Sequence, residues 1–359
     1  MTEPLPRGST IGILGGGQLG RMLASAAAKL GLKTHIYAPE QNAVAAHVTG
    51  KFTCAAYEDA KALALFAKSV DVITYEFENV PVETAEQLVI AGAILRPGVE
   101  ALKIAQDRLN EKQFARKLDI ATARYMPIAS AEALEMAMQV TGMPAILKTR
   151  RFGYDGKGQA VIYESSEAAD ALKELANAPA ILEGFVPFAT EISVIVARGI
   201  DGNIACYDPP ENLHTDGILC QSSVPAKIDE SVKADAIKLA TKIVDTLSYI
   251  GVLAVEFFVE KNGGLILNEI APRVHNSGHW TSDACTCGQF EQHIRAISGW
   301  PLGSTMRHSD CIMKNLIGKE IEPVAQLAAS THNCVTDYGK GEPREGRKMG
   351  HVTTLKPRT

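Results

Sequence analysis

The sequence lacks the features of secreted, membrane-spanning and metal-finger proteins. Its seven cysteines show no CxxC spacing, and we interpret the one close pair, Cys285 and Cys287, as core packing. The longest apolar runs, such as residues 251–258, are far too short to span a bilayer. Residues 1–9 carry prolines and charges but no apolar signal core. We therefore expect a soluble cytoplasmic protein, with no membrane contact and with reduced thiols.

The sequence also lacks a strong excess of either charge. It has 36 Lys and Arg against 41 Asp and Glu, a net charge of −5, which gives no reason to expect nucleic-acid binding. A hydrophobic fraction of 46% and a charged fraction of 21% are those of an ordinary globular protein. At roughly 150 residues per domain, the 359 residues predict two or three domains.

The first hundred residues alternate between short apolar runs and a helical pattern. Residues 10–14 read as a buried strand, followed by a helix that ends at Gly31. Residues 33–37 and 71–76 read as further strands. Strands that alternate with helices predict a parallel sheet with right-handed crossovers.

A glycine-rich turn joins the first strand to its helix. Gly15, Gly17 and Gly20 fit the dinucleotide-binding spacing. That site also needs an acid at the end of the second strand, where residues 37–39 are Tyr-Ala-Pro. The glycines therefore indicate an anion more firmly than NAD(P), and an oxidoreductase is kept only as an alternative. Glu76 follows a strand at the ligand-binding edge, where it either contacts a ligand or lies in a solvated loop.

The middle of the chain combines a strand-end lysine with a basic, glycine-rich segment. Lys148 ends the predicted strand 143–148, and residues 150–159 add three glycines and three further basic residues. Such a segment can close over a polyphosphate, with backbone donors and positive charge. A mobile hairpin tip is the alternative interpretation.

The most informative segment predicts a hairpin with two facing acids. An Asn-Gly pair at residues 262–263 is typical of a two-residue turn. That turn places Glu256 opposite Glu269, on one face with Phe258 and Leu267. Facing carboxylates repel, so the pair would share a proton or bind a divalent cation. We favour Mg²⁺, which takes one or two carboxylates plus phosphate oxygens.

In chain order, these features resemble the ATP-grasp superfamily. Five segments narrow the resemblance: GGGQLGRM at 15–22, YEFENV at 75–80, YDGKGQ at 154–159, RVHNSGHWT at 273–281 and GRKMGH at 346–351. Together they are similar to the 5-(carboxyamino)imidazole ribonucleotide synthetase family of purine biosynthesis, over nearly the whole chain. The implied fold is α/β, with α+β character in the C-terminal part: an ATP-grasp fold preceded by a Rossmann-like parallel-sheet domain. The implied domains are residues 1–107, a central lid at 108–185, and 186–359 with the metal hairpin and a basic tail.

The resemblance implies the ligands of ATP and Mg²⁺. The implied ATP-binding residues are Arg108, Lys148, Gly153, Tyr154, Asp155, Gly156, Lys157, Gly158, Gln159, Glu183, Gly184, Phe185, Val186, Glu191, His214, Asn268 and Glu269. Glu256 and Glu269 are the implied Mg²⁺ ligands. Many ATP-grasp enzymes carry a third ligand, an Asn, where this chain has Ala271, so we expect no third protein ligand.

The resemblance also implies a site for aminoimidazole ribonucleotide. Its residues are Glu76, Tyr154, Asp155, Arg273, His275, Asn276, Lys340, Arg347 and Lys348. The last three lie in a basic tail suited to a phosphate, although a solvated tail is the alternative. The implied catalytic residues are Lys148, Asp155, Arg273 and His275: Lys148 neutralises phosphate charge, Arg273 and His275 hold bicarbonate or the intermediate, and Asp155 orients or deprotonates the amine.

The implied enzyme is an ATP-dependent carboxylate–amine ligase that acts as a homodimer. It would join bicarbonate to the exocyclic amine of aminoimidazole ribonucleotide, through carboxyphosphate or through CO₂ released from it. A formate-dependent glycinamide ribonucleotide transformylase is the nearest alternative, and the segment at 274–280 favours the carboxylating enzyme. A non-catalytic nucleotide sensor is less consistent with intact Lys148, Glu256 and Glu269.

Overall fold

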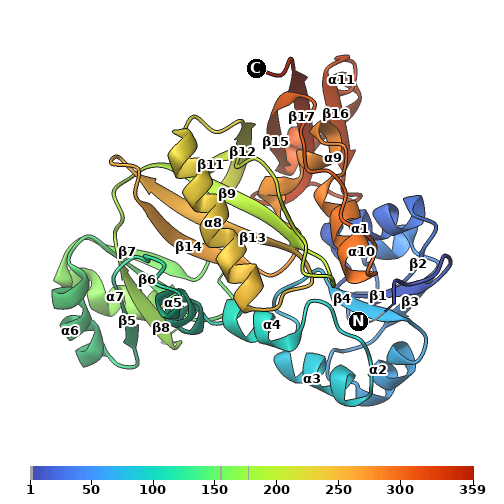
Figure 1. Ribbon diagram of the computed structural model, residues 1–359. Coiled ribbons are helices and arrows are strands. Elements are labelled where there is room, and N and C mark those ends of the chain that lie inside the picture. The colour runs from blue at the N-terminus through green and yellow to red at the C-terminus, as the bar shows by residue number, and fades with distance from the viewer. Residues whose placement is uncertain (1–2, 154–155, 177) are drawn as a thin grey trace.

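The chain folds around three β-sheets, one parallel and two antiparallel (Figure 1). The computed structural model describes residues 3–153, 156–176 and 178–359. The predicted α/β fold class is confirmed, whereas the domain boundaries at residues 107 and 185 stay a prediction. The α-helices are α1 (Gln18–Lys29), α2 (Ala60–Ala67), α3 (Val82–Ile90), α4 (Val99–Ala105), α5 (Arg108–Lys117), α6 (Ala131–Thr141), α7 (Ala168–Glu174), α8 (Glu230–Thr246), α9 (Thr281–Ala284), α10 (Gln289–Ile297) and α11 (Val324–Leu327). Within the described ranges, no helix is long and apolar enough to cross a membrane.

The N-terminal sheet is parallel, with strand order β3-β2-β1-β4. Its strands are β1 (Thr10–Leu14), β2 (Lys33–Ala38), β3 (Lys51–Cys54) and β4 (Val72–Tyr75). The predicted strands at 10–14, 33–37 and 71–76 are thus confirmed to within a residue or two at each end. The helix α1 buries Leu19, Leu23 and Ala27 along one stripe, because residues three to four apart share a helix face. The loop after β4 leaves the carboxyl edge of this sheet.

The central sheet is antiparallel, with strand order β5-β8-β6-β7. Its strands are β5 (Tyr125–Ile128), β6 (Ala145–Thr149), β7 (Gln159–Ile162) and β8 (Ala180–Gly184). The helices α6 and α7 share a core with its strands, through residues such as Leu134, Leu172 and Leu147. In Figure 1 this green unit lies at the opposite side of the molecule from the blue N-terminal sheet.

The third sheet has nine strands and forms the body of the molecule. Its order is β14-β13-β9-β11-β12-β15-β17-β16, with β10 paired to β9. The strands are β9 (Phe188–Arg198), β10 (Ile204–Cys206), β11 (Glu211–Thr215), β12 (Ile218–Val224), β13 (Gly251–Glu260), β14 (Leu265–Ala271), β15 (Asp310–Ile317), β16 (Asn333–Asp337) and β17 (Lys348–Lys356). One face packs against α8, and the other shares a core with α10 and the N-terminal sheet.

The buried ring of His293 on α10 ties the N-terminal sheet to the large sheet. Its Nδ1 accepts from the Val252 N–H at 3.0 Å, so Nε2 carries the hydrogen and donates to Thr74 Oγ1 at 2.8 Å. Burial lowers the pKa of His293 to about 3, which keeps the ring neutral. Since Thr74 lies near the end of β4, this bridge fixes the loop after β4 relative to β13.

Candidate active site

The β13–β14 hairpin turns differently from the prediction. The predicted two-residue turn at 262–263 is wrong, because the Glu260 N–H donates to the Gly264 carbonyl at 2.8 Å and three residues lie between them. The strand pairing near the turn is therefore shifted by one residue. Leu267 pairs with Phe257 rather than with Phe258, and the predicted common face of Phe258 and Leu267 is wrong as well.

A β-bulge cancels this shift farther along the hairpin. The pairing changes register after Phe257, and Asn268 is the extra residue on β14. Glu256 then pairs directly with Glu269, as predicted. Because of the bulge, Leu267 and Ile270 both enter the core beneath α8 while Glu269 stays on the open face. The two acids meet through two deviations from a regular hairpin.

The facing acids are poorly compensated. Burial and the charge of Glu269 raise the pKa of Glu256 to about 7. Among the described residues, the contacts of the Glu256 carboxylate are long, 3.4 Å to Asn268 Nδ2 and 3.6 Å to His275 Nε2. The Glu269 carboxylate lies 3.5 Å from Arg108 Nη1. A cation between the acids would relieve their repulsion, so the donor set fits a divalent ion.

The composition of this pair suits Mg²⁺. Over the ranges of the chain that the structure describes, no group of three or more His, Cys, Asp or Glu has the arrangement of a metal site. Ala271, at the position of the third ligand in many ATP-grasp enzymes, carries no donor side chain and is buried. Two carboxylates with phosphate oxygens and water are a ligand set that Mg²⁺ accepts.

A second buried cluster, on the central sheet, contains Lys148. Its Nζ donates to Glu183 Oε2 at 2.9 Å, and Lys112 Nζ lies 3.6 Å from Glu183 Oε1. Burial alone raises the pKa of Glu183, but the charges of Lys112 and Lys148 outweigh it and bring the pKa to about 2. The side chain of Glu183 therefore holds Lys148 in place. Lys112 was not among the predicted site residues.

The start of α5 places Arg108 beside Glu269. Asp107 caps the helix by accepting from the Leu109 N–H at 2.9 Å. The same carboxylate accepts from both Nε and Nη2 of Arg150, at 3.0 and 2.6 Å. This links the helix to the end of β6, and the Arg108 N–H also donates to the Arg150 carbonyl. The backbone of Arg108 is thus fixed by the cap at Asp107 and by its hydrogen bond to Arg150, which places its side chain beside Glu269.

The glycine-rich segment after β6 approaches the large sheet. A Cβ at Gly156 would lie 2.8 Å from the Asp216 carbonyl, in the turn between β11 and β12. Gly156 and Gly158 have φ near +70°, a region that favours glycine. Lys157 is exposed and Gln159 begins β7. Tyr154 and Asp155, predicted for both ligands, lie outside the described residues.

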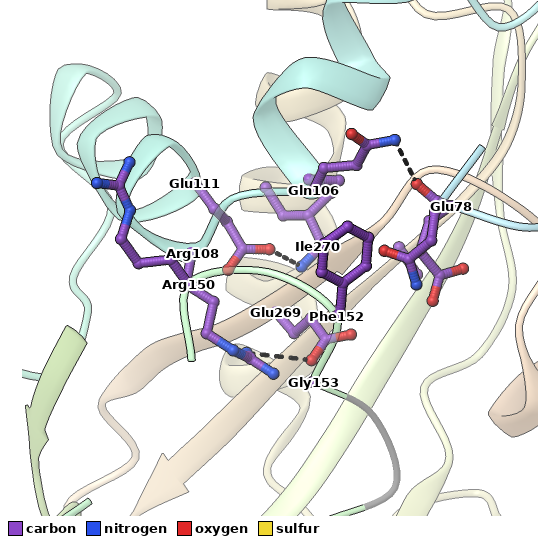
Figure 2. A pocket seen from close by; sticks show the side chains of 12 residues that line it. Glu78, Gln106, Arg108, Glu111, Arg150, Phe152, Gly153, Glu269 and Ile270 are labelled. Atoms are coloured by element: carbon purple, nitrogen blue, oxygen red, sulfur yellow. Dashed lines mark hydrogen bonds and ion pairs between the residues drawn. The ribbon is translucent and has the colours of Figure 1, made fainter. Parts of the chain in front are cut away.

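An open pocket lies between this segment and β14 (Figure 2). Its lining residues are Glu78, Asn79, Ala105, Gln106, Arg108, Glu111, Arg150, Phe152, Gly153, Glu269, Ile270 and Ala271. Of the predicted ATP residues, Arg108, Gly153 and Glu269 share this pocket. Of its acids, Glu78 and Glu111 were not predicted as site residues.

The remaining predicted ATP residues lie on two sheets. Glu191 on β9 and His214 on β11 are partners, with Nδ1 2.8 Å from Glu191 Oε2, and this contact raises the pKa of His214 although burial opposes it. Gly184 ends β8, and Phe185 and Val186 follow in the connection to β9. Phe185 donates its N–H to the Pro144 carbonyl and leaves its ring half exposed. Their contacts with ATP stay a prediction.

Arg273 is held by an acid that sequence reasoning did not select. Glu78, in the loop after β4, pairs with Arg273 through two hydrogen bonds, to Nε and, at 2.8 Å, to Nη2. Burial alone would raise the pKa of Glu78, but the guanidinium charge outweighs it and lowers the pKa. The Glu-x-Glu spacing at 76 and 78, after a strand that ends at the ligand-binding edge, was the available signal.

His275 is oriented by a chain of buried hydroxyl groups. Asn212 Nδ2 donates to Ser193 Oγ, which donates to Ser277 Oγ at 2.7 Å. Ser277 Oγ then lies 2.8 Å from His275 Nδ1, which also accepts from the Ser277 N–H. The hydrogen of the neutral ring is thus on Nε2, facing Glu256. Burial, with the charge of Arg273, lowers the pKa of His275 well below its ordinary value.

Glu76 occupies the donors of the first glycine-rich turn. Its carboxylate accepts from the Gly17 N–H at 2.8 Å and from the Gly20 N–H at 3.1 Å. A Cβ at Gly15 would lie 2.6 Å from Glu76 Cγ, so glycine is required by close approach as well as by its φ of +112°. The anion at this turn is a side chain of the protein itself. Gly17 and Gly20 therefore have no free N–H for a dinucleotide phosphate.

The predicted residues for the ribonucleotide come from the loop after β14 and from the tail. Asn276 exchanges two amide hydrogen bonds with buried Asn315, at 3.1 and 2.8 Å. Lys340 Nζ donates to the Lys348 carbonyl at 2.7 Å. The charge of Lys348 acts on both Glu256 and His275, so β17 begins near the acid pair. Arg347 precedes it and accepts from the Gly318 N–H through its carbonyl.

Comparison with known protein families agrees with this arrangement along the whole chain. Residues 8–106 match the ribonucleotide synthetase preATP-grasp domain, and residues 113–290 match the ATP-grasp domain. Residues 311–359 match the phosphoribosylaminoimidazole carboxylase C-terminal domain. The three matches follow one another without overlap.

Individual relatives match almost end to end. The N5-carboxyaminoimidazole ribonucleotide synthase of Brucella melitensis is 52% identical, over 99% of this chain and 98% of its own. A crystal structure of such a synthetase in complex with ADP has a TM-score of 0.96 at 41% identity, covering 100% of this chain and 95% of that one. The Aspergillus clavatus enzyme, in complex with ADP and 5-aminoimidazole ribonucleotide, has a TM-score of 0.92 at 28% identity, covering 98% and 94%. This chain belongs to the N5-carboxyaminoimidazole ribonucleotide synthase family.

Proposed function

We propose that the chain carboxylates the exocyclic amine of 5-aminoimidazole ribonucleotide, using bicarbonate and ATP, in purine biosynthesis. The products are N5-carboxyaminoimidazole ribonucleotide, ADP and phosphate. The carrying observation is that Glu256 and Glu269 face each other beside Arg108, with Arg273 and His275 on the loop that follows. The family's names and the ligands of its solved members support the choice of substrate.

The ATP site uses charges that the fold has already oriented. Lys148 and Arg108 would contact phosphate oxygens, since both lie in a region of buried charge and Glu183 holds Lys148. Glu256 and Glu269 would hold Mg²⁺, which neutralises phosphate charge when bound. The segment 153–159 would cover the phosphates and exclude water. Glu191, with His214 as partner, would accept from a ribose hydroxyl.

The chemical step activates bicarbonate. A bicarbonate oxygen attacks the γ-phosphorus and ADP leaves, giving carboxyphosphate. The amine then attacks the carboxyl carbon of carboxyphosphate and displaces phosphate. Alternatively, carboxyphosphate first splits into CO₂ and phosphate, and the amine attacks the CO₂. The amine loses one proton in either case. Arg273, oriented by Glu78, and the Nε2–H of His275 would hold the anionic carboxyl group. Asp155 would orient or deprotonate the amine.

The ribonucleotide would bind between the loop after β14 and the tail. Lys340, Arg347 and Lys348 provide positive charge for its 5′-phosphate, and Asn276, held by Asn315, offers its remaining hydrogen-bonding capacity. Glu76 would act mainly through the glycine turn that it holds. We also propose a homodimer in the cytoplasm, on the strength of the family resemblance; light scattering of the purified chain tests the dimer.

One assay tests the proposal. ADP release is measured with ATP, Mg²⁺ and bicarbonate, and each of bicarbonate and 5-aminoimidazole ribonucleotide is omitted in turn. We expect full turnover only with both. Glycinamide ribonucleotide with formate serves as the matched alternative substrate pair. Turnover that is undiminished without the aminoimidazole nucleotide, or that is supported by formate, would contradict the proposed function.

A further inference from the structure

The direction of Glu269 depends on a single extra residue in β14. In a regular strand, neighbouring side chains alternate between faces, so Glu269 would share the face of Leu267. That face is the core beneath α8, where Leu267 is fully buried. The bulge at Asn268 moves Glu269 to the open face instead, opposite Glu256. The acid pair therefore exists only while the bulge is maintained.

The bulge lies on the edge strand β14, whose outer side pairs there through a bridge of Leu267 with Thr122, in which the Leu267 N–H donates to the Ala121 carbonyl at 2.8 Å. Because β14 is the last strand of the nine-stranded sheet, its remaining outer backbone groups around the bulge need partners outside the sheet. Two adjacent residues of α5 supply them. Glu111 Oε1 accepts from the Ile270 N–H at 2.6 Å (Figure 2), and Lys112 Nζ donates to the Asn268 carbonyl at 2.7 Å and the Leu267 carbonyl at 3.4 Å.

These contacts are made by ionisable side chains in an unfavourable place. Glu111 and Lys112 are each only 1% exposed, and Glu111 Oε2 has no hydrogen-bond partner. Lys112 is compensated in part by Glu183, 3.6 Å away, whereas burial of Glu111 with an unpaired oxygen is costly, so stability alone does not explain the glutamate. Their hydrogen bonds converge on residues 267–270, the bulge and the residues on either side of it.

We propose that Glu111 and Lys112 are positioning residues that clamp the β14 bulge and so direct Glu269 toward Glu256. Glu111 holds the backbone N–H after the bulge, and Lys112 holds the carbonyl of the extra residue. Neither residue is assigned a contact with the reacting atoms. The clamp rests on the proposed Mg²⁺ role of the acid pair, because its consequence is a correctly formed metal site.

The test measures ADP affinity by calorimetry, with and without Mg²⁺, in the full-length protein. Glu111→Leu removes the acceptor for Ile270, and Glu111→Gln keeps one. Mg²⁺ should increase the affinity for ADP, and we expect this increase to be at least about tenfold smaller in Glu111→Leu. Removal of outer-shell groups has an effect of this size at metal sites. Because Glu111 also lines the pocket, the affinity for ADP without Mg²⁺ is measured for each variant as the reference for its own gain, and Glu111→Gln should keep most of that gain. Gln113→Ala, at an exposed position of the same helix, is the control.

A second measurement reports on the backbone itself. Hydrogen exchange of β14 should accelerate in Glu111→Leu and stay near normal in Glu111→Gln, since Ile270 N–H points to Glu111 rather than to a strand. If Glu111→Leu does not fold, Glu111→Asp replaces it, because its shorter carboxylate cannot reach Ile270. If Ile270 N–H loses its acceptor and the variant still gains the full ADP affinity from Mg²⁺, the proposed clamp is wrong.

Glu269→Gln separates the two proposals. If this variant loses the Mg²⁺ gain while Glu111→Leu keeps it, the metal role stands and the clamp is wrong. If Glu269→Gln keeps the gain, the metal role is wrong and the clamp falls with it. If Glu269→Gln and Glu111→Leu both lose the Mg²⁺ gain while Glu111→Gln keeps it, the metal role and the clamp are both supported.

Discussion

Two largely enclosed glutamates in this molecule, with side chains 4% exposed at Glu183 and 15% exposed at Glu256, have opposite acidity. Glu183 lies between Lys148 and Lys112, and its pKa is about 2. Glu256 faces another acid, and its pKa is about 7. Burial raises the pKa in both cases, so the difference comes from the neighbouring charges. The central sheet contains its own counter-ions, whereas at the hairpin Arg108 contacts Glu269 at 3.5 Å and Glu256 has no lysine or arginine partner among the described residues.

The cluster around Glu183 is an ion cluster with a structural role, whereas the Glu256–Glu269 pair has the charge pattern of a cation-binding site. At Glu183 the charges are satisfied within the protein, and the cluster holds Lys148, for which we propose a contact with phosphate. At Glu256 the unfavourable pairing is retained by the bulge and by α5. A strained electrostatic arrangement that the fold actively maintains is typical of a functional site.

The largest effect is expected from breaking the compensated cluster. Glu183→Gln leaves two buried lysines without their acid, and we expect a loss of about 3 kcal/mol or more in the free energy of unfolding. Glu256→Gln is the matched control, because it removes repulsion and should be neutral or stabilising without Mg²⁺. Urea unfolding of both variants measures the difference. Equal destabilisation would contradict the comparison.

Removal of the second acid should abolish Mg²⁺-dependent catalysis. Glu269→Ala is expected to give a folded protein whose ATP turnover falls at least about 100-fold, since even outer-shell groups are worth about 10- to 100-fold. Steady-state ADP release over a range of Mg²⁺ concentrations measures this. Near-normal turnover would remove the metal hypothesis.

The pH dependence of stability should report the acid pair. Because the pKa of Glu256 rises from 4.5 to about 7 on folding, the folded state binds more protons between these pH values. Its stability relative to Glu256→Gln should therefore fall as pH rises through this range, by up to about 3.5 kcal/mol over the full titration at about 1.4 kcal/mol per pKa unit. Unfolding of both proteins at several pH values, without Mg²⁺, tests the sign. Addition of ADP and Mg²⁺ should abolish the trend.

A smaller effect is expected at the neutral partner of the acid pair. Ser277→Ala removes the hydroxyl that orients His275, a hydrogen bond worth about 1 kcal/mol. We expect kcat to fall about fivefold, while the KM for ATP stays unchanged because Ser277 does not belong to the nucleotide site. A change confined to the KM for ATP would argue against this orientation of His275.

The elements of the fold were largely predictable because local patterns determine them. The strands at residues 10–14 and 33–37 and the helix that ends before Gly31 follow from apolar runs, helical periodicity and a terminating glycine. The acid pair was predicted too, but through a turn that the structure does not have. A change of phase was visible in the sequence: Leu267 and Ile270 are three residues apart, and both are apolar in a strand with period two. Such a break indicates a bulge.

Contacts distant in the sequence were not predictable in the same way. Glu78 and Arg273 are 195 residues apart, and nothing local indicates which of the acids near Glu76 would pair with the guanidinium. The contacts of Glu111 and Lys112 with β14 were not predictable either, because the partners in that strand are backbone atoms. Backbone partners leave no trace in a single sequence.

The sequence by itself determined the residue types, the order of the elements and the family resemblance, since these depend on neighbouring positions and on motifs. Tertiary structure decided which charges are compensated. It paired Glu183 with lysines from α5 and β6, turned Glu76 toward the glycine turn, and left Glu256 facing Glu269. The physical reason is that electrostatic interactions depend on distance and burial, and both are properties of the assembled fold.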